Sequence, residues 1–183
     1  MISSIAFCQQ VNTVISYETE LDNPGNRFIF YQPAQPVFIA DFKGHPEAGS
    51  DAVAITNSGF MFKMGYRSAG GNETLNIKVF CSFDKEKSWM KENGKTDYIL
   101  QHEQLHFDIS YLSTLLFINK LKGTKFTTQK YQSQIRDVYD AAVNTLEQLQ
   151  NLYDTETRNG QVKEKQQAWT AKIKMQLHSL AVN

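Results

Sequence analysis

The stretch T-D-Y-I-L-Q-H-E-Q-L-H-F-D-I, from Thr96 to Ile109, decides how this chain folds and what chemistry it carries. Its apolar residues recur at helical spacing, which predicts a helix from about Asp97 to Lys120. Within that helix, residues 102–106 read H-E-x-x-H. Side chains four positions apart on a helix lie about 5–6 Å from each other on one face. His102 and His106 can therefore approach the same ion.

This motif has a chemical meaning because each residue type has a role. Neutral imidazole nitrogens bind zinc at about 2.0–2.1 Å, and zinc lowers the pKa of a bound water to about 7. Glu103 lies a quarter turn further round the helix, from where its carboxylate can reach that water. The motif therefore predicts a Zn²⁺ site formed by His102 and His106, with Glu103 as the general base of a peptide hydrolase.

A metal-free interpretation of the two histidines has to be weighed as well. Apolar residues share their helix face and predict that this face turns into the domain: Tyr98, Leu105, Ile109, Leu112 and Leu116. Buried imidazoles without partners cost a few kcal/mol, and a shared metal is the simplest partner. We therefore favour a metal over a satisfied pair of core histidines.

The motif leaves the third ligand open. Catalytic zinc normally has three protein ligands and one open position. No third histidine follows at the spacing of the longer H-E-x-x-H-x-x-G-x-x-H pattern, so a carboxylate from the next helix is expected. If the two helices pair as an antiparallel hairpin about Gly123-Thr124, the level of His102 corresponds to Glu147. Asp140 is nearer the turn, and Asp154 lies two turns beyond Glu147 on the same face.

The chain around the motif falls into two segments of different composition. Residues 11–84 are rich in β-branched and aromatic residues, and residues 97–181 are helical in pattern. Expected strands cover residues 11–17, 27–31, 36–42, 52–66 and 75–83, with a turn at 69–72. Expected helices cover residues 97–120, 128–153 and 161–180, with Asp97 and Thr128 as N-caps and Gly123 and Gly160 as stops. This order predicts one α+β domain over residues 9–183, with a mostly antiparallel or mixed sheet followed by three helices.

Composition excludes several classes of protein. The 183 residues carry 19 basic and 19 acidic side chains, so the formal net charge is zero, which argues against a nucleic-acid partner held by phosphate contacts. No apolar run approaches the ~20 residues of a membrane-spanning helix, so no transmembrane segment is expected. Two cysteines are too few for a disulfide scaffold or a cysteine-rich zinc module. A peptide or protein substrate is the expected partner.

The first eight residues bear on the compartment. Residues 1–8 are small and apolar without a basic residue, and they read as the end of a signal peptide, or else as an ordinary first strand or frayed terminus. The first interpretation predicts a secreted or periplasmic protein. If Cys8 is retained in an oxidising compartment, a bridge between Cys8 and Cys81 is an option.

Several segments in the same order resemble a bacterial family described as secreted zinc-dependent proteases, domain of unknown function family 922. Residues 96–109 resemble its helix with the core H-E-Q-x-H-F-D-I, and residues 40–46, 52–59 and 87–89 resemble its D-F-x-G-x-P, A-x-T-x-S-G and S-W elements. Residues 153–160, followed by Gln166 and Trp169, resemble Y-D-x-x-T-x-H-G and Q-x-x-W. The resemblance spans about residues 36–175 and implies a zincin-like fold, a zinc ion and peptide hydrolysis.

The resemblance also ranks the candidate residues. Because Tyr153-Asp154 belongs to its second motif, it moves Asp154 ahead of Glu147 as third ligand, with Glu156 as a further candidate. Tyr153 is a candidate donor to the oxyanion of a tetrahedral intermediate, although it also continues the apolar stripe of its helix.

The sequence departs from the family pattern at one position, and three other features carry structural predictions. Asn159 stands where the family tends to have His, which supports an alternative, a non-catalytic zincin-like module that binds a peptide or a cell-envelope partner. Trp169 is expected to pack in the core, and Asp108 to cap or orient a neighbour. The strand at 75–83 is expected to pair with an extended peptide.

Overall fold

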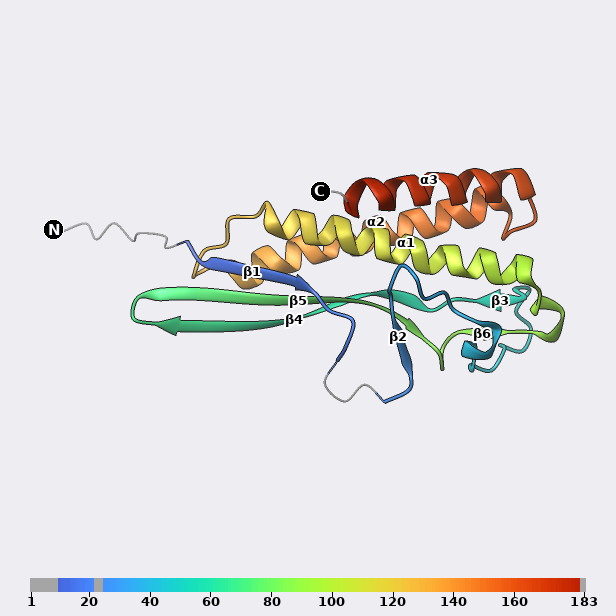
Figure 1. Ribbon diagram of the computed structural model, residues 1–183, viewed down its shortest axis with the longest axis horizontal. Coiled ribbons are helices and arrows are strands. Elements are labelled where there is room, and N and C mark those ends of the chain that lie inside the picture. Colours follow the sequence, from blue (N-terminus) through green and yellow to red (C-terminus); the bar gives the residue numbers. More distant parts are fainter. Residues whose placement is uncertain (1–9, 22–24, 182–183) are drawn as a thin grey trace.

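The computed structural model describes residues 10–21 and 25–181 and shows a sheet followed by three helices (Figure 1). The strands are β1 (Asn12–Tyr17), β2 (Phe28–Phe30), β3 (Ala54–Ile55), β4 (Ser58–Ala69), β5 (Asn72–Asp84) and β6 (Trp89–Met90). The helices are α1 (Asp97–Lys122), α2 (Tyr131–Thr157) and α3 (Lys163–Ala181), with short 3-10 turns at Ile39–Asp41 and Glu92–Gly94. The α+β class and the order of strands before helices are confirmed.

Strand β5 is the centre of the main sheet. Strand β4 runs antiparallel along one edge of β5, from Ser58 opposite Phe83 to Ala69 opposite Asn72. The other edge of β5 pairs with β1, which is parallel, and further along with β2, which is antiparallel. The sheet is therefore mixed. The prediction that this strand takes up a peptide is wrong, because both of its edges are already paired.

Local backbone conformation explains why one predicted element is confirmed and another is wrong. Gly70 and Gly71 have φ of 59° and 80°, which lets a two-residue turn join β4 to β5 with the twist that the hairpin needs. Residues 36–42 were predicted as a strand but contain the 3-10 turn Ile39–Asp41 instead. There the Asp41 carboxylate accepts a hydrogen bond from the Phe38 amide at 2.9 Å, and this local bond competes with strand pairing.

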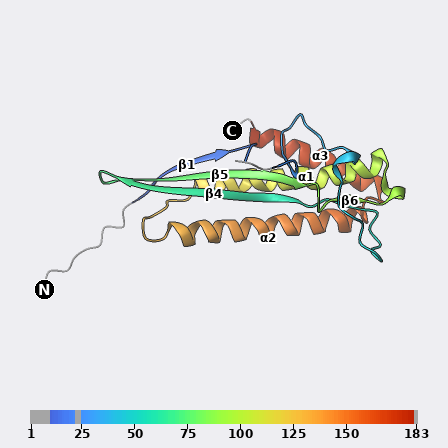
Figure 2. The same ribbon diagram turned by 90° about the horizontal axis from the view of Figure 1, so that it is seen from below.

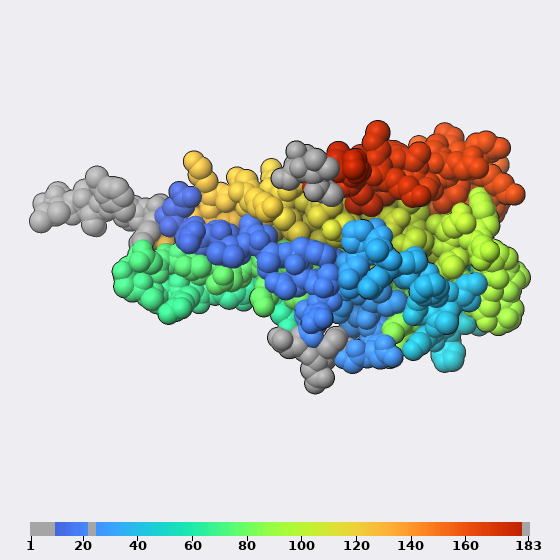
Figure 3. All heavy atoms as spheres, viewed as in Figure 1, coloured from blue at the N-terminus to red at the C-terminus, as the bar shows by residue number. Residues whose placement is uncertain are grey.

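Helix α1 is enclosed by the rest of the protein. One face lies on the sheet, α2 packs beside it and α3 covers it from above, so α1 is only partly visible in the space-filling view (Figures 1, 2 and 3). Thr96, rather than the predicted Asp97, is its N-cap and accepts a hydrogen bond from the Ile99 amide at 3.2 Å. Since α1 is surrounded, most of its motif is buried.

The core joins the sheet to α1. Three residues of β5 that point to the same side, Leu75, Ile77 and Val79, are fully buried in one cluster with Leu105, Ile109 and Leu112 of α1. Leu116 was predicted to face inward with them, but it is 42% exposed. The inward face of α1 instead continues through Phe117, Ile118 and Leu121, which are buried in the same cluster, so only Leu116 was placed on the wrong face.

Two expectations concern membranes and the N-terminus. Within residues 10–21 and 25–181, no helix is long and apolar enough to cross a membrane. Residues 1–8 lie outside the described residues. The signal-peptide remnant and the bridge from Cys8 to Cys81 therefore stay predictions, and the structure shows only that Cys81 is buried.

An ion pair ties β2 to the end of β5. The Arg27 guanidinium donates to the Asp84 carboxylate, with Nε–Oδ1 and Nη2–Oδ2 distances of 3.0 and 2.5 Å. Burial raises the pKa of Asp84, but the hydrogen bonds from Arg27 outweigh it and leave that pKa below its usual value. A carboxyl with a depressed pKa stabilises the fold above the pKa of the unfolded chain, about 3.9, and loses this contribution as pH falls through the folded value.

We expect Asp84→Asn to lower the free energy of unfolding at pH 7 by about 1–2 kcal/mol, since hydrogen bonds to charged groups contribute about 1.5–3 kcal/mol and Arg27 remains partly in water. The difference from wild type should begin to shrink as pH falls below about 3.9, where Asp84 takes up a proton in the unfolded chain, and should disappear as pH falls through the lower folded value. Urea unfolding at several pH values measures both. Glu86→Gln is the control, because the Glu86 side chain is 62% exposed and 3.5 Å from Arg27. An equal loss at pH 3 and pH 7 would contradict this account.

Candidate metal centre

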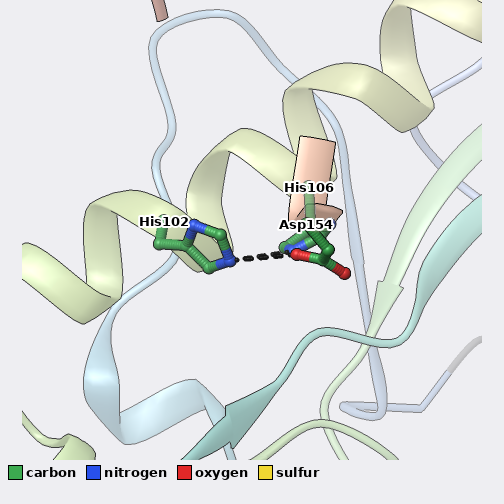
Figure 4. Close-up of side chains that lie close together, drawn as sticks. All are labelled: His102, His106 and Asp154. Atoms are coloured by element: carbon green, nitrogen blue, oxygen red, sulfur yellow. Dashed lines mark hydrogen bonds and ion pairs between the residues drawn. The ribbon is translucent and has the colours of Figure 1, made fainter. Parts of the chain in front are cut away.

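Helices α1 and α2 bring three possible metal ligands to one point (Figure 4). The Nε2 atoms of His102 and His106 lie 3.2 Å from each other. The Oδ1 atom of Asp154 lies 3.2 Å from the first and 3.0 Å from the second. Among the described residues, this is the one group of three His, Cys, Asp or Glu side chains arranged to hold a metal ion.

The donor set fits a small divalent cation. Donor atoms about 2.0–2.2 Å from a tetrahedral zinc lie roughly 3.3–3.6 Å from one another. The three observed separations, 3.0 to 3.2 Å, are close to that spacing. Two imidazoles and one carboxylate also form a typical three-residue set for catalytic zinc, which leaves a fourth position open. The residues present therefore match a site for a small divalent cation.

Electrostatics couple the three side chains. Burial raises the pKa of Asp154, but hydrogen bonds and charge interactions with His102 and His106 outweigh it and hold that pKa far below its usual range. Burial lowers the pKa of His106, but the hydrogen bond with Asp154 and the charges of Glu103 and Asp154 raise it above its usual value. The site thus favours an ionised carboxylate beside positive charge, whether that charge is a proton or a metal ion.

Side chains from α2 and α3 contact the outer edges of both imidazoles. The Nδ1 atom of His106 faces Oε1 of Gln150, and the Nδ1 atom of His102 faces Oε1 of Gln166 at 2.9 Å. The ring of Tyr153 stacks on the His102 ring with their centroids 4.6 Å apart. Each histidine is therefore held on the side opposite the metal position.

A small cavity of about 70 Å³ lies next to the three ligands. It is lined by residues 52–55, Ile99, Glu103 and Asn159 in addition to His102, His106 and Asp154. Glu103 is only 4% exposed, and no described residue forms a hydrogen bond with its carboxylate. The Glu103 oxygens are not among the fully buried side-chain atoms that lack a partner, so the carboxylate is open to this cavity, where a water or a substrate group can bond to it.

The turn between α2 and α3 packs directly on His102. Arg158, Asn159 and Gly160 all have positive φ, 51°, 52° and 81°. The Gly160 amide donates to Thr157 Oγ1 at 3.2 Å, and its carbonyl accepts from the Tyr98 hydroxyl. A Cβ atom on Gly160 would lie 3.2 Å from Cγ and Nδ1 of His102. The backbone approaches the ring so closely because residue 160 has no side chain.

The structure distinguishes among the residues that were predicted as the third ligand. Asp154 joins the two histidines, whereas Glu147 is exposed on α2 and Glu156 is exposed and accepts a hydrogen bond from the Trp169 indole. Helix levels favoured Glu147 because the hairpin was centred on Gly123-Thr124. The connection instead spans residues 123–130, and α2 begins at Tyr131 rather than at Thr128. The longer connection shifts the pairing of the helices by about two turns.

Three other residues singled out from the sequence, Tyr153, Trp169 and Asp108, make packing or hydrogen-bond contacts. Tyr153 is fully buried and its hydroxyl donates to Gln166 at 2.6 Å; it does not line the cavity, so the core interpretation describes its position and an oxyanion role stays a prediction. Trp169 is buried, as expected. Asp108 accepts hydrogen bonds from Tyr31 at 3.0 Å and from Gln104 at 2.8 Å, and thus orients neighbours away from the metal position.

Gln150 is the contact that sequence reasoning missed. It lies four residues before Asp154, one turn earlier on the same face of α2, and this spacing was the available signal. Glutamine is so common on helix surfaces that the spacing alone would not have identified it. Gln166 appeared in the quoted Q-x-x-W resemblance, but without a role.

Comparison of this chain with models of known protein families, with curated proteins and with solved structures finds no match. The likeness to the protease family stays a prediction. The function is therefore inferred from the geometry of the site.

We expect Asp154→Ala to weaken zinc binding by more than about 100-fold, beyond the 10–100-fold that loss of an outer hydrogen-bond partner typically causes. The removed carboxylate is one of three ligand atoms within 3.2 Å of each other. Competition with a chromophoric chelator measures the affinity. Glu147→Ala is the matched control, since Glu147 is an exposed acid on the same helix. Equal affinities of the two variants would remove Asp154 from the site.

We expect Gly160→Ala to weaken zinc binding by about 10-fold or more, because the added methyl group displaces the His102 ring from its position. Gly71→Ala is the control for backbone strain, since Gly71 has φ of 80° against 81° for Gly160 and nothing within 4 Å of its added Cβ. Both changes should cost about 1–2 kcal/mol of stability. Loss of zinc affinity in both variants, or in neither, would show that contact with His102 is not the cause.

Proposed function

We propose that this protein is a zinc-dependent peptidase, in which His102, His106 and Asp154 hold the metal and Glu103 is the general base. A single observation carries the proposal. The Glu103 carboxylate, to which no described residue donates a hydrogen bond, shares a small cavity with three converging ligand atoms. A metal site alone does not require such a carboxylate, whereas hydrolysis by an activated water does.

When bound, zinc supplies a Lewis acid that lowers the pKa of a water to about 7 and polarises a carbonyl oxygen. Glu103 has the position to accept a proton from a water in the cavity and to return it to the leaving amine. Its burial keeps competing solvent away, because the side chain is 4% exposed. The ligands leave one side of the ion position open to the cavity, so water and a substrate carbonyl can reach it.

Strand β3 gives a reason to favour a peptide as the substrate. It pairs only with β6 among the described strands, and the Lys91 amide donates to the Val53 carbonyl at 2.8 Å. In an antiparallel pair the backbone groups alternate in direction, so N–H and C=O of Ala54 face away from β6, on the side where Ala54, itself 6% exposed, lines the cavity. Since residues 52–55 line the cavity, an extended peptide that adds to this side of β3 would pass beside the metal ligands.

The resemblance supports the same proposal in three further respects. It adds a zincin-like fold, zinc rather than another divalent ion, and a secreted or periplasmic location. The order of its quoted motifs agrees with the cavity wall, since residues 52–55, the H-E-x-x-H helix and Asp154 with Asn159 all line it. Asn159 occupies the place of the family His and has an amide rather than an imidazole to offer a substrate.

The size of the cavity favours one alternative, a zincin-like module that binds a peptide or cell-envelope partner without cleaving it. A volume of about 70 Å³ is small beside the roughly 300–1,000 Å³ of typical small-molecule sites. Zinc affinity together with peptide binding but no hydrolysis would select this alternative. Zinc content after purification and reconstitution, and the visible spectrum of the cobalt-substituted protein, establish whether a tetrahedral site forms.

We expect Glu103→Gln to retain zinc with unchanged affinity and to lose at least about 100-fold in hydrolysis of a fluorescence-quenched peptide library, because a general base contributes about 10²–10⁴-fold. The amide has nearly the same shape but cannot take the proton. Glu147→Gln should hydrolyse the library at the wild-type rate. Undiminished hydrolysis by the Glu103 variant would end the proposed mechanism.

A further inference from the structure

We infer that Gln150 is a positioning residue, which holds a proton on Nδ1 of His106 and so makes Nε2 the atom that offers its electron pair to a metal. This inference deepens the proposed function and rests on it, because it names the residue that prepares one ligand for the metal. It concerns the chain itself and can be tested without substrate.

The orientation of the Gln150 amide is fixed by its own neighbours. Its Nε2 atom lies 2.9 Å from the His106 carbonyl oxygen and 3.2 Å from Ser110 Oγ. A carbonyl oxygen only accepts hydrogen bonds, so the group that faces it is the NH₂ end of the amide. The other end, Oε1, then faces Nδ1 of His106.

This orientation decides the protonation of Nδ1 on the imidazole. An amide oxygen is an acceptor, so Nδ1 of His106 has to donate. Nε2 faces the Asp154 carboxylate, which accepts a hydrogen bond from a proton at that atom in the metal-free protein, and a metal ion would take the place of that proton. Nε2 is the atom that lies 3.0 Å from Asp154 and 3.2 Å from His102. Its electron pair is thereby directed at the point where the three ligand atoms converge.

A hydrogen-bond chain anchors this arrangement to the sheet. Ser110 Oγ, which Gln150 contacts, lies 2.8 Å from Ser58 Oγ at the start of β4. Ser110 is fully buried. The amide is thus held by α1 and, through Ser110, by β4, although Gln150 itself belongs to α2. Packing of all three elements has to be complete before His106 is oriented.

Gln166 does not constrain His102 to the same degree. Its Oε1 faces both Nδ1 of His102 and the Tyr153 hydroxyl, but its Nε2 is buried without a hydrogen-bond partner among the described residues. Nothing on the nitrogen side fixes this amide. Gln150 therefore constrains His106 more tightly than Gln166 constrains His102, and the second pair provides an internal comparison.

Nitrogen-15 NMR of the metal-free wild-type protein reports directly which ring nitrogen of His106 carries a proton. We expect His106 to have a proton on Nδ1, and we expect Gln150→Met to shift His106 toward the form protonated only on Nε2. The exposed Gln148 of the same helix provides the control, since Gln148→Met should leave the protonation of Nδ1 unchanged. A wild-type His106 without a proton on Nδ1 would overturn the inference, and this result does not depend on whether any variant folds.

Zinc affinity gives a second readout. Gln150→Met should weaken binding by about 10–100-fold, the range typical for loss of an outer partner of a ligand histidine, while Gln148→Met stays within about twofold of wild type. Equal affinities of wild type and Gln150→Met would overturn the positioning role. Failure of wild type to bind zinc would instead refute the proposed function, and the protonation of Nδ1 in the metal-free protein would still decide the role of Gln150.

Discussion

The contact between α1 and the last turns of α2 places three electron-pair donors within 3.2 Å of one another, and the rest of the site depends on it. Such atoms repel unless a proton or a metal ion lies between them. Breaking up the cluster would leave a nearly buried imidazole without its partner, at a cost of a few kcal/mol. A cation at this point therefore stabilises the packing of two helices as well as the site. Metal binding at this point would therefore be coupled to the packing of α1 on α2.

The position of Asp154 strengthens this coupling. It lies in the last turn of α2, where the helix dipole carries the equivalent of about half a negative charge and disfavours an anion. The histidines nonetheless keep the pKa of its carboxyl far below the usual range. The contacts with His102 and His106 thus compensate both the burial of the carboxylate and its place at the end of the helix. The three positive φ angles that follow turn the chain back so that Gly160 can pack on His102.

How much of this could be predicted depends on the range of the interaction. The predictions for Asp97–Lys120 and for His102 with His106 rest on spacing within one helix, and the structure agrees because local geometry fixes that spacing. Asp154 belongs to a different helix, and its level depends on the length of an irregular connection, which periodicity does not measure. The interior position of β5 and the contact of Gln150 depend on which elements pair, and one sequence gives no direct signal of that pairing.

Burial of α1 has a consequence for substrates. The sheet, α2 and α3 close three sides of the helix, so a substrate can reach Glu103 only from the remaining side. Of the residues that line the cavity, Ile55 and Asn159 are exposed, which places the opening between β3 and the turn after α2. A cavity of about 70 Å³ cannot enclose a folded domain or a large side chain. If the proposed peptidase function holds, an extended backbone that presents one carbonyl to the ligands would fit this opening better than a compact substrate would.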